Sequence, residues 1–265
     1  MKFPVITVDS FSSKPFAGNP AAVCLNTKDL DDSVLQNIAL EMNLSETAFP
    51  VPLENSNPCN NWSLRWMTPT HEVPLCGHAT LAASLVLKDR NLIDAQKPLR
   101  FQTLSGELII RFEGETSVVM DFPKPEIRPV DLAEEIPRAL GIEPVEIFTD
   151  DVDHYLVIEN YDQIKQLDPD LKTLAKSKTR AFCVTAKAPD DSEVDFVSRL
   201  FGPGVGIDED PVTGSTHCVL GPYWKEKLYP KENKRLLAEQ QSPRGGRMEL
   251  EVQESRVLII GTGCL

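Results

Sequence analysis

The sequence reads Glu72-Val73-Pro74-Leu75-Cys76-Gly77-His78-Ala79-Thr80 and repeats this phrase, altered, as Glu209-Asp210-Pro211-Val212-Thr213-Gly214-Ser215-Thr216-His217. Both copies follow the pattern Glu-x-Pro-aliphatic-(Cys or Thr)-Gly-polar-small. In a chain of 265 residues, a phrase that returns after about half the length indicates two similar halves. We therefore expect each half to bring an equivalent loop to a shared, two-sided active site.

Composition and charge narrow the class of protein. The length allows two domains of roughly 100 to 150 residues each. A hydrophobic content of 41% with 25% charged residues is ordinary for a soluble globular protein. The net charge of −13 argues against nucleic-acid binding, which needs clustered Lys and Arg to neutralise phosphates. An acidic enzyme that binds a small molecule is the simpler interpretation.

The N-terminal residues 1–9 contain no apolar stretch of the kind found in a signal peptide, and no later segment approaches the roughly 20 apolar residues of a membrane span. We expect a cytoplasmic protein without a membrane partner. The six cysteines are scattered and form no C-x-x-C pair, which favours reduced core thiols over a disulfide framework or a zinc ribbon. They are Cys24, Cys59, Cys76, Cys183, Cys218 and Cys264.

Hydrophobic periodicity predicts both helices and strands. The run 79–87 is apolar nearly all round, which is typical of a helix enclosed by its domain, and 215–224 is its expected counterpart. Pro222 should kink that second helix. Three prolines within 123–129 favour an extended linker, so we expect domains at 1–122 and 123–265, with a last strand that can return to the first domain. Further helices are predicted over 31–42 and 132–140, and strands over 2–9, 21–25, 62–66, 101–104, 107–112, 117–122, 155–158, 181–184, 248–252 and 256–260.

Gly77 and Gly214 each lie where a loop enters an apolar helix. Backbone N–H groups at a helix N-terminus attract anions, and glycine lets a ligand approach closely. Two such helix starts facing each other would hold a carboxylate or stabilise an enolate. The alternative is two ordinary helix caps, and the repetition favours the functional interpretation.

Residues 43–50 are predicted as a loop that runs into a short strand, and Glu46 lies in this loop between Leu44 and Ala48-Phe49. A carboxyl group against apolar walls has a raised proton affinity, which suits a group that accepts and returns a proton near neutral pH. The alternative is a solvated surface glutamate.

His78 and Asp210 occupy neighbouring places in the two copies of the phrase, and either could orient a substrate or relay a proton. The helix dipole at the start of a helix disfavours a charged imidazolium, so His78 is a plausible neutral hydrogen-bond donor. Ser215 is the counterpart of His78, and its alternative role is to cap its own helix.

The quoted motifs resemble those of the phenazine biosynthesis PhzF-like isomerases. The resemblance rests on Leu44-Ser45-Glu46-Thr47-Ala48-Phe49, on Cys76-Gly77-His78-Ala79-Thr80, on Asp210-Pro211-Val212-Thr213-Gly214-Ser215 and on Phe16-Ala17-Gly18-Asn19-Pro20-Ala21-Ala22-Val23. It covers the whole chain in order. It implies an α+β, diaminopimelate-epimerase-like fold with two pseudo-symmetric domains, each a sheet wrapped around a central helix, and an active site in the cleft between them.

The same resemblance implies site residues and partners. The matching glutamate of the phenazine enzyme shuttles a proton on dihydro-hydroxyanthranilate, so Glu46 would be the general acid and base. Catalytic His78 and Asp210 would line the site, and Asn19, Ser45, Gly77, Gly214 and Ser215 would bind a small carboxylate substrate. The family uses no cofactor or metal, and it suggests a homodimer.

Related racemases use two facing cysteines, at the positions of Cys76 and Thr213. A threonine hydroxyl is too weak an acid to replace a thiol at neutral pH, so proton transfer by Glu46 alone fits better. Three alternatives stay open: a racemase that uses Cys76, a metal enzyme whose ligands are Cys76, His78, His217 and Cys218, and a ligand-binding protein without turnover.

Overall fold

The computed structural model describes residues 3–54 and 58–265, so Lys2, the first residue of the expected opening strand, lies outside the described residues. The chain divides into two compact units, one of Met1–Phe122 with Leu258–Leu265 and one of Pro123–Val257. No helix among residues 3–54 and 58–265 has the length and apolarity that crossing a membrane requires.

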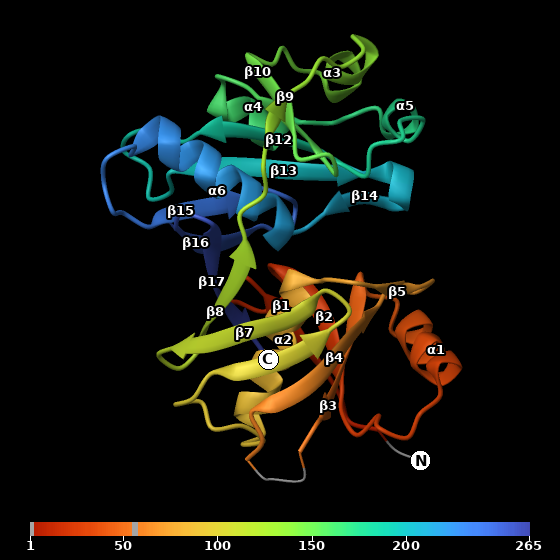
Figure 1. The fold of residues 1–265 in the computed structure, drawn as a ribbon. Coiled ribbons are helices and arrows are strands. Elements are labelled where there is room, and N and C mark those ends of the chain that lie inside the picture. The colour runs from red at the N-terminus through yellow and green to blue at the C-terminus, as the bar shows by residue number, and fades with distance from the viewer. Residues whose placement is uncertain (1–2, 55–57) are drawn as a thin grey trace. The chain divides into compact units, whose positions relative to one another are not determined.

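The first unit is a curved set of strands around one buried helix (Figure 1). That helix, α2 (Gly77–Asp89), packs against β1, β2 and β3, and ten of its residues in succession, 78–87, are buried. The enclosed helix expected from the apolar run is therefore confirmed. The unit also contains β1 (Val5–Ser10), β2 (Asn19–Cys24), α1 (Asp32–Met42), β3 (Glu46–Pro52), β4 (Asn61–Met67), β5 (Glu72–Val73), β6 (Leu99–Thr103), β7 (Gly106–Glu113) and β8 (Ser117–Pro123).

The last strand, β17 (Arg256–Cys264), pairs antiparallel with β1, where Asp9 lies opposite Cys264. Two glycines of this strand permit close packing against α2. A Cβ atom at Gly261 would lie 2.6 Å from the Leu81 side chain, and one at Gly263 would lie 2.5 Å from the Leu85 side chain. Any larger residue at these positions would force the Leu81 or Leu85 side chain to move.

The second unit repeats this plan around α6 (Gly214–Leu228) (Figure 1). Alternate residues of β12 (Phe182–Lys187) show that both faces of this strand are covered. Phe182 and Val184 belong to an apolar cluster with α3, α4 and α5, whereas the Thr185 hydroxyl accepts a hydrogen bond from Trp224 of α6 at 3.0 Å. The elements are β9 (Arg128–Pro129), α3 (Glu135–Leu140), β10 (Glu146–Thr149), β11 (His154–Val157), α4 (Tyr161–Gln166), α5 (Leu171–Leu174), β12 (Phe182–Lys187), β13 (Phe196–Gly202), the 3₁₀ turn η1 (Pro203–Val205), β14 (Ile207–Asp210), β15 (Leu236–Gln240) and β16 (Gly246–Val252).

The strand pairings of the two units correspond. In the first, β4 is antiparallel to β3 and β5 and parallel to β6. In the second, β13 is antiparallel to β12 and β14 and parallel to β15. Each copy of the repeated phrase thus begins on the short strand, β5 or β14, and ends in the helix that follows, α2 or α6.

One sequence-based expectation about local structure was wrong. Glu46 was expected in the loop part of 43–50, before a short strand, but that strand, β3, already starts at Glu46, which lies opposite Ala21 in a parallel pair with β2. Pro222 lies inside α6, which continues through it to Leu228. Proline removes one backbone donor, and the burial of Tyr223 and Trp224 immediately after it favours continuation of the helix.

Candidate functional site

Glu46 and Asn19 lie at the same end of two neighbouring strands. Asn19 begins β2 and is fully buried, and Glu46 begins β3, which runs parallel to β2. The Glu46 side chain is 14% exposed, so it is largely withdrawn from water yet still accessible. Ser45, immediately before β3, is half-buried. The structure therefore places three of the predicted site residues along one edge of the first unit.

His78, in the first turn of α2, points toward this edge. Its Nε2 atom lies 3.3 Å from Oε2 of Glu46, and its Nδ1 atom lies 3.5 Å from Sγ of Cys76. Its backbone carbonyl accepts a hydrogen bond from the Ser10 hydroxyl at 2.8 Å, which fixes the start of α2 against the end of β1. The sequence prediction that groups Glu46 with His78 thus corresponds to a real contact, although 32 positions separate the two residues (78 − 46).

Burial controls the protonation of His78. The imidazole is almost fully enclosed, and this desolvation lowers the pKa of His78 to about 3, so the ring is neutral at pH 7. The Nε2 contact with Glu46 is close but poorly aligned, and this buried atom has no hydrogen-bond partner. In the tautomer with its proton on Nε2, His78 would direct that proton toward the Glu46 carboxylate and accept the Cys76 thiol proton on Nδ1.

The second copy of the phrase builds a different set of contacts. Its Asp210 carboxylate accepts a hydrogen bond from the Thr213 hydroxyl. Gln240 joins the same loop, because its amide nitrogen donates to the Asp210 carbonyl at 2.6 Å and its amide oxygen accepts from the Thr213 N–H at 2.9 Å. Ser215, the counterpart of buried His78, is exposed, and its hydroxyl lies 3.5 Å from an Arg180 nitrogen. Ser215 does not cap α6, so that alternative is wrong.

His217 and Cys218 are core residues of α6. The His217 Nδ1 atom donates to the Thr213 carbonyl at 2.7 Å, because a carbonyl can only accept, and the ring stacks on Phe196. Burial lowers the pKa of His217 to about 4, so this ring is also neutral at pH 7. Of the four ligands in the metal-enzyme alternative, these two belong to the packing of the second unit.

A pair of arginines that the sequence reasoning missed anchors the two copies. Arg65 of β4 makes two hydrogen bonds to the carboxylate of Glu72, at 2.8 and 2.7 Å. Arg199 of β13 holds Glu209 in the same way, at 2.7 and 2.8 Å. Glu72 and Glu209 are the first residues of the phrase, so the glutamate repeated in both copies was the sequence signal that could have indicated a cationic partner.

The two central helices begin without acidic or capping side chains. Neither Cys76, the N-cap of α2, nor Thr213, the N-cap of α6, makes a side-chain cap hydrogen bond, and no acidic residue lies in either first turn. The short surface helices differ, because Asn160 caps α4 and Asp170 caps α5. At the helix starts of Gly77 and Gly214, no acidic side chain of the first turn therefore offsets the positive end of the helix dipole.

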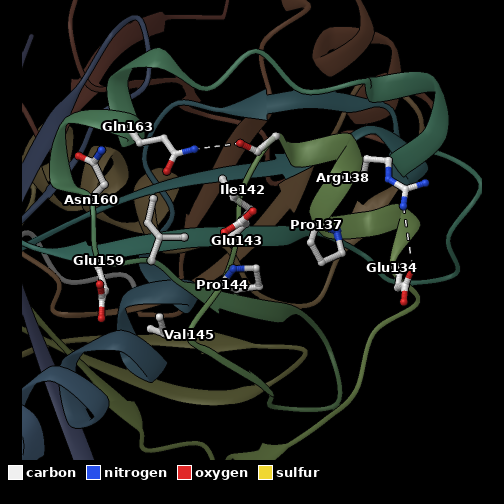
Figure 2. A pocket seen from close by; sticks show the side chains of 12 residues that line it. Glu134, Pro137, Arg138, Ile142, Glu143, Pro144, Val145, Glu159, Asn160 and Gln163 are labelled. Atoms are coloured by element: carbon white, nitrogen blue, oxygen red, sulfur yellow. Dashed lines mark hydrogen bonds and ion pairs between the residues drawn. The ribbon is translucent and has the colours of Figure 1, made fainter.

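A surface hollow of about 880 Å³ lies elsewhere, in the second unit between α3 and the start of α4 (Figure 2). Its rim includes the ion pair of Glu134 with Arg138, and Gln163 donates to the Gly141 carbonyl at 2.9 Å. Among the described residues that line it, none belongs to the predicted site. Because the hollow is open and its acidic groups are spread along the rim, the enclosed group around Glu46 is the better candidate for catalysis.

Comparison with known proteins identifies the family of the chain. The model of a family described as phenazine biosynthesis-like protein matches residues 8–265. An uncharacterized isomerase of Pseudomonas aeruginosa is 46% identical over 265 residues, which cover 100% of this chain and 97% of that protein. A crystal structure of a PhzF-family phenazine biosynthesis protein from Enterococcus faecalis has a TM-score of 0.90 at 40% identity, covering 100% of this chain and 97% of that one.

A more distant structure shares the fold alone. A probable proline racemase from Agrobacterium radiobacter has a TM-score of 0.63 at 8% identity, over 99% of this chain and 91% of that one. These neighbours confirm the epimerase-like α+β fold that the sequence motifs implied.

Proposed function

The chain belongs to the phenazine biosynthesis-like protein family and is an isomerase, and from this premise we propose that Glu46 is the general acid and base that moves a proton on a small carboxylate substrate. The reaction needs no cofactor in this proposal. Glu46 takes a proton from one carbon of the substrate, becomes a carboxylic acid, and returns the proton to another carbon on the same face. The net change is the shift of one proton and one double bond.

The observation that carries this proposal is the contact between Glu46 and a buried, neutral imidazole. A general base must be partly withdrawn from water and still reach its substrate, and the 14% exposure of the Glu46 side chain meets both conditions. His78 lies 3.3 Å away and is held neutral by burial, so it can orient the carboxylate without forming a permanent ion pair. A charged partner would stabilise the carboxylate and weaken it as a base.

The start of α2 supplies a place for the negative charge of the substrate. Gly77 is the first residue of this helix, whose first turn carries no acidic side chain. Backbone N–H groups at this point would bind a substrate carboxylate and stabilise the enolate that forms when the carbon loses its proton. Asn19 and Ser45 are proposed substrate contacts on the same edge, and Asp210, Gly214 and Ser215 stay predicted contacts from the second copy.

Hydrogen–deuterium exchange tests the proposal directly. We would incubate dihydro-hydroxyanthranilate and a panel of cyclic and amino-acid carboxylates with the enzyme in D₂O and follow the carbon-bound protons by NMR. Exchange with the intact enzyme and none with a folded Glu46→Gln variant is the expected result. Exchange that survives in the variant would remove Glu46 from the mechanism, and exchange that occurs nowhere in the panel would favour a binding protein.

The racemase alternative has one observation in its favour, the contact of the Cys76 thiol with His78 at 3.5 Å. A two-thiol mechanism needs a second thiol, however, and the second copy has Thr213, whose hydroxyl donates to Asp210. We therefore rank it below proton transfer by Glu46. Inversion of a D- or L-amino acid that stops in Cys76→Ala would reverse this order.

A further inference from the structure

We propose that Glu46, Cys76 and His78 form a binding site for a thiophilic divalent cation such as Zn²⁺, and that the bound ion inhibits the enzyme by occupying Glu46. One carboxylate, one thiol and one imidazole are ligand types that zinc prefers, and three protein ligands leave a fourth position for water. The inhibitory part rests on the proposed function of Glu46. The binding part does not.

The distances fit such an ion. With Zn–N and Zn–O bonds of about 2.0 to 2.2 Å, a tetrahedral site separates nitrogen and oxygen ligands by about 3.4 Å, and sulfur and nitrogen by about 3.6 Å. His78 Nε2 and Glu46 Oε2 are 3.3 Å apart, and one ligand atom from each of the three residues lies within 4.8 Å of the others. The Cys76 thiol lies 3.5 Å from the other ring nitrogen, Nδ1, so a rotation of this side chain toward Nε2 completes the set.

A second, independent observation points to a ligand at this place. His78 is only 6% exposed, and its Nε2 atom is buried without a hydrogen-bond partner. A buried polar atom in this condition is costly, and a metal ion would satisfy it. The neutral imidazole can ligate at once, whereas the Cys76 thiol must release its proton to solvent as the Cys76–metal bond forms, so binding should strengthen as the pH rises.

The second copy of the phrase provides an internal contrast. Thr213 and Ser215 stand in the places of Cys76 and His78, and a hydroxyl is a much weaker zinc ligand than a thiolate or an imidazole. The proposal therefore predicts one equivalent of zinc for each chain, not two.

Metal titration of the full-length protein tests the site. Protein that has been reduced and dialysed against a chelator would be titrated with ZnCl₂ by calorimetry and with CdCl₂ by the ultraviolet absorption of the thiolate–cadmium bond. We expect one saturable equivalent, an affinity reduced at least about tenfold in Glu46→Gln and Cys76→Ser, and no absorption band in Cys76→Ser. Cys264→Ser removes a more exposed thiol of the same unit and serves as the matched control, with unchanged binding.

Two results would overturn the site: absence of saturable binding, or an absorption band that persists in Cys76→Ser and disappears in Cys264→Ser. Because these readouts do not use turnover, they decide the site even if the exchange assay finds no substrate. Where exchange is found, stoichiometric zinc should stop it in the wild type and in Cys264→Ser. Exchange that continues at saturating zinc would overturn the inhibitory part.

Discussion

The two copies of the repeated phrase share a scaffold and differ in their chemistry. In both copies, an arginine on the preceding strand, Arg65 of β4 or Arg199 of β13, makes two hydrogen bonds to the first glutamate of the phrase. The side chain four positions after the N-cap donates a hydrogen bond to the N-cap carbonyl. Thr80 does so to Cys76, and His217 does so to Thr213 at 2.7 Å. The first copy presents a thiol and a buried imidazole beside Glu46, whereas the second presents two hydroxyl residues and an aspartate.

This difference separates structure from function within one chain. The arginine pairs and the hydrogen bonds back to the N-cap, which occur in both copies, serve to fold the strand and helix whatever chemistry the loop carries. Features confined to the first copy, the neutral His78 and its contact with Glu46, are candidates for catalysis. Variants that change one copy and leave the other intact test this assignment of roles.

The largest effect on proton exchange should come from replacing Glu46, which contacts His78 of the first copy. Glu46→Gln keeps the size and polarity of the side chain but cannot accept a proton, so we expect proton exchange to fall by about 10²- to 10⁴-fold. Thermal unfolding should change little, which serves as the control for folding. Asp210→Asn is the matched change in the second copy, and a smaller loss of exchange there is expected. Equal losses in both variants would contradict the assignment of the base to the first copy.

The shared arginines should differ in their effect on stability because they differ in burial. The Arg199 side chain is 8% exposed and also donates to the carbonyls of Ile164 and Leu167, so Arg199→Met removes the cation beside Glu209 and a donor from each of these two carbonyls. We expect a loss of about 3 to 5 kcal/mol in the free energy of unfolding.

Arg65 is a third exposed, and its partner Asp32 is mostly in solvent, so Arg65→Met should cost only about 1 kcal/mol. Urea unfolding of both variants measures the difference. Replacing Glu209 as well as Arg199 with apolar residues should recover part of the larger loss. Similar costs for Arg65 and Arg199 would show that burial does not set the strength of this anchor.

The two buried histidines predict a loss of stability in acid. The folded-state pKa is about 3 for His78 and about 4 for His217, below the value of about 6.5 expected in the unfolded chain. At a pH between the folded-state and unfolded-state pKa values, the unfolded state binds more protons than the folded state. The free energy of unfolding is therefore fully retained above about pH 6.5 and falls as the pH is lowered below that value. Each histidine should contribute about 1.4 kcal/mol per pH unit.

Denaturant unfolding at pH 7 and pH 5 checks this sign. The difference between the two stabilities should shrink by about 2 kcal/mol in His78→Gln and again in His217→Gln. His71→Gln, at an exposed position, is the control for the replacement of a histidine by glutamine. An unchanged pH dependence in the first two variants would mean that these rings are protonated in the folded protein.

Hydrophobic periodicity and the repeated phrase were sufficient to predict the central helices and the loops before them. The apolar run 79–87 identified α2, and the repeat located the loops that precede both central helices. Sequence reasoning missed β13, because a strand that is buried on both faces lacks an alternating pattern. It also missed Arg65 and Arg199, whose importance depends on pairings between strands that only the folded chain reveals.

For the candidate site, motif and geometry gave different information. The motifs pointed to Glu46 and His78 but not to the 3.3 Å between them, since strand register and the depth of α2 determine that distance. The role of Ser215 was open between capping and binding, and the structure removed capping because Thr213 is the N-cap. The distance between Glu46 and His78 depends on tertiary packing, which the local sequence does not determine.

The smallest effect on activity should come from the thiol itself. Cys76→Ala removes a side chain that contacts His78 at 3.5 Å but has no second thiol to work with, because Thr213 stands in the other copy. We expect proton exchange to fall less than about tenfold, measured by NMR in D₂O beside Glu46→Gln. The same variant should no longer be inhibited by zinc. A loss of exchange as deep as that of Glu46→Gln would instead make Cys76 a catalytic residue, and the first copy would then operate by thiol chemistry.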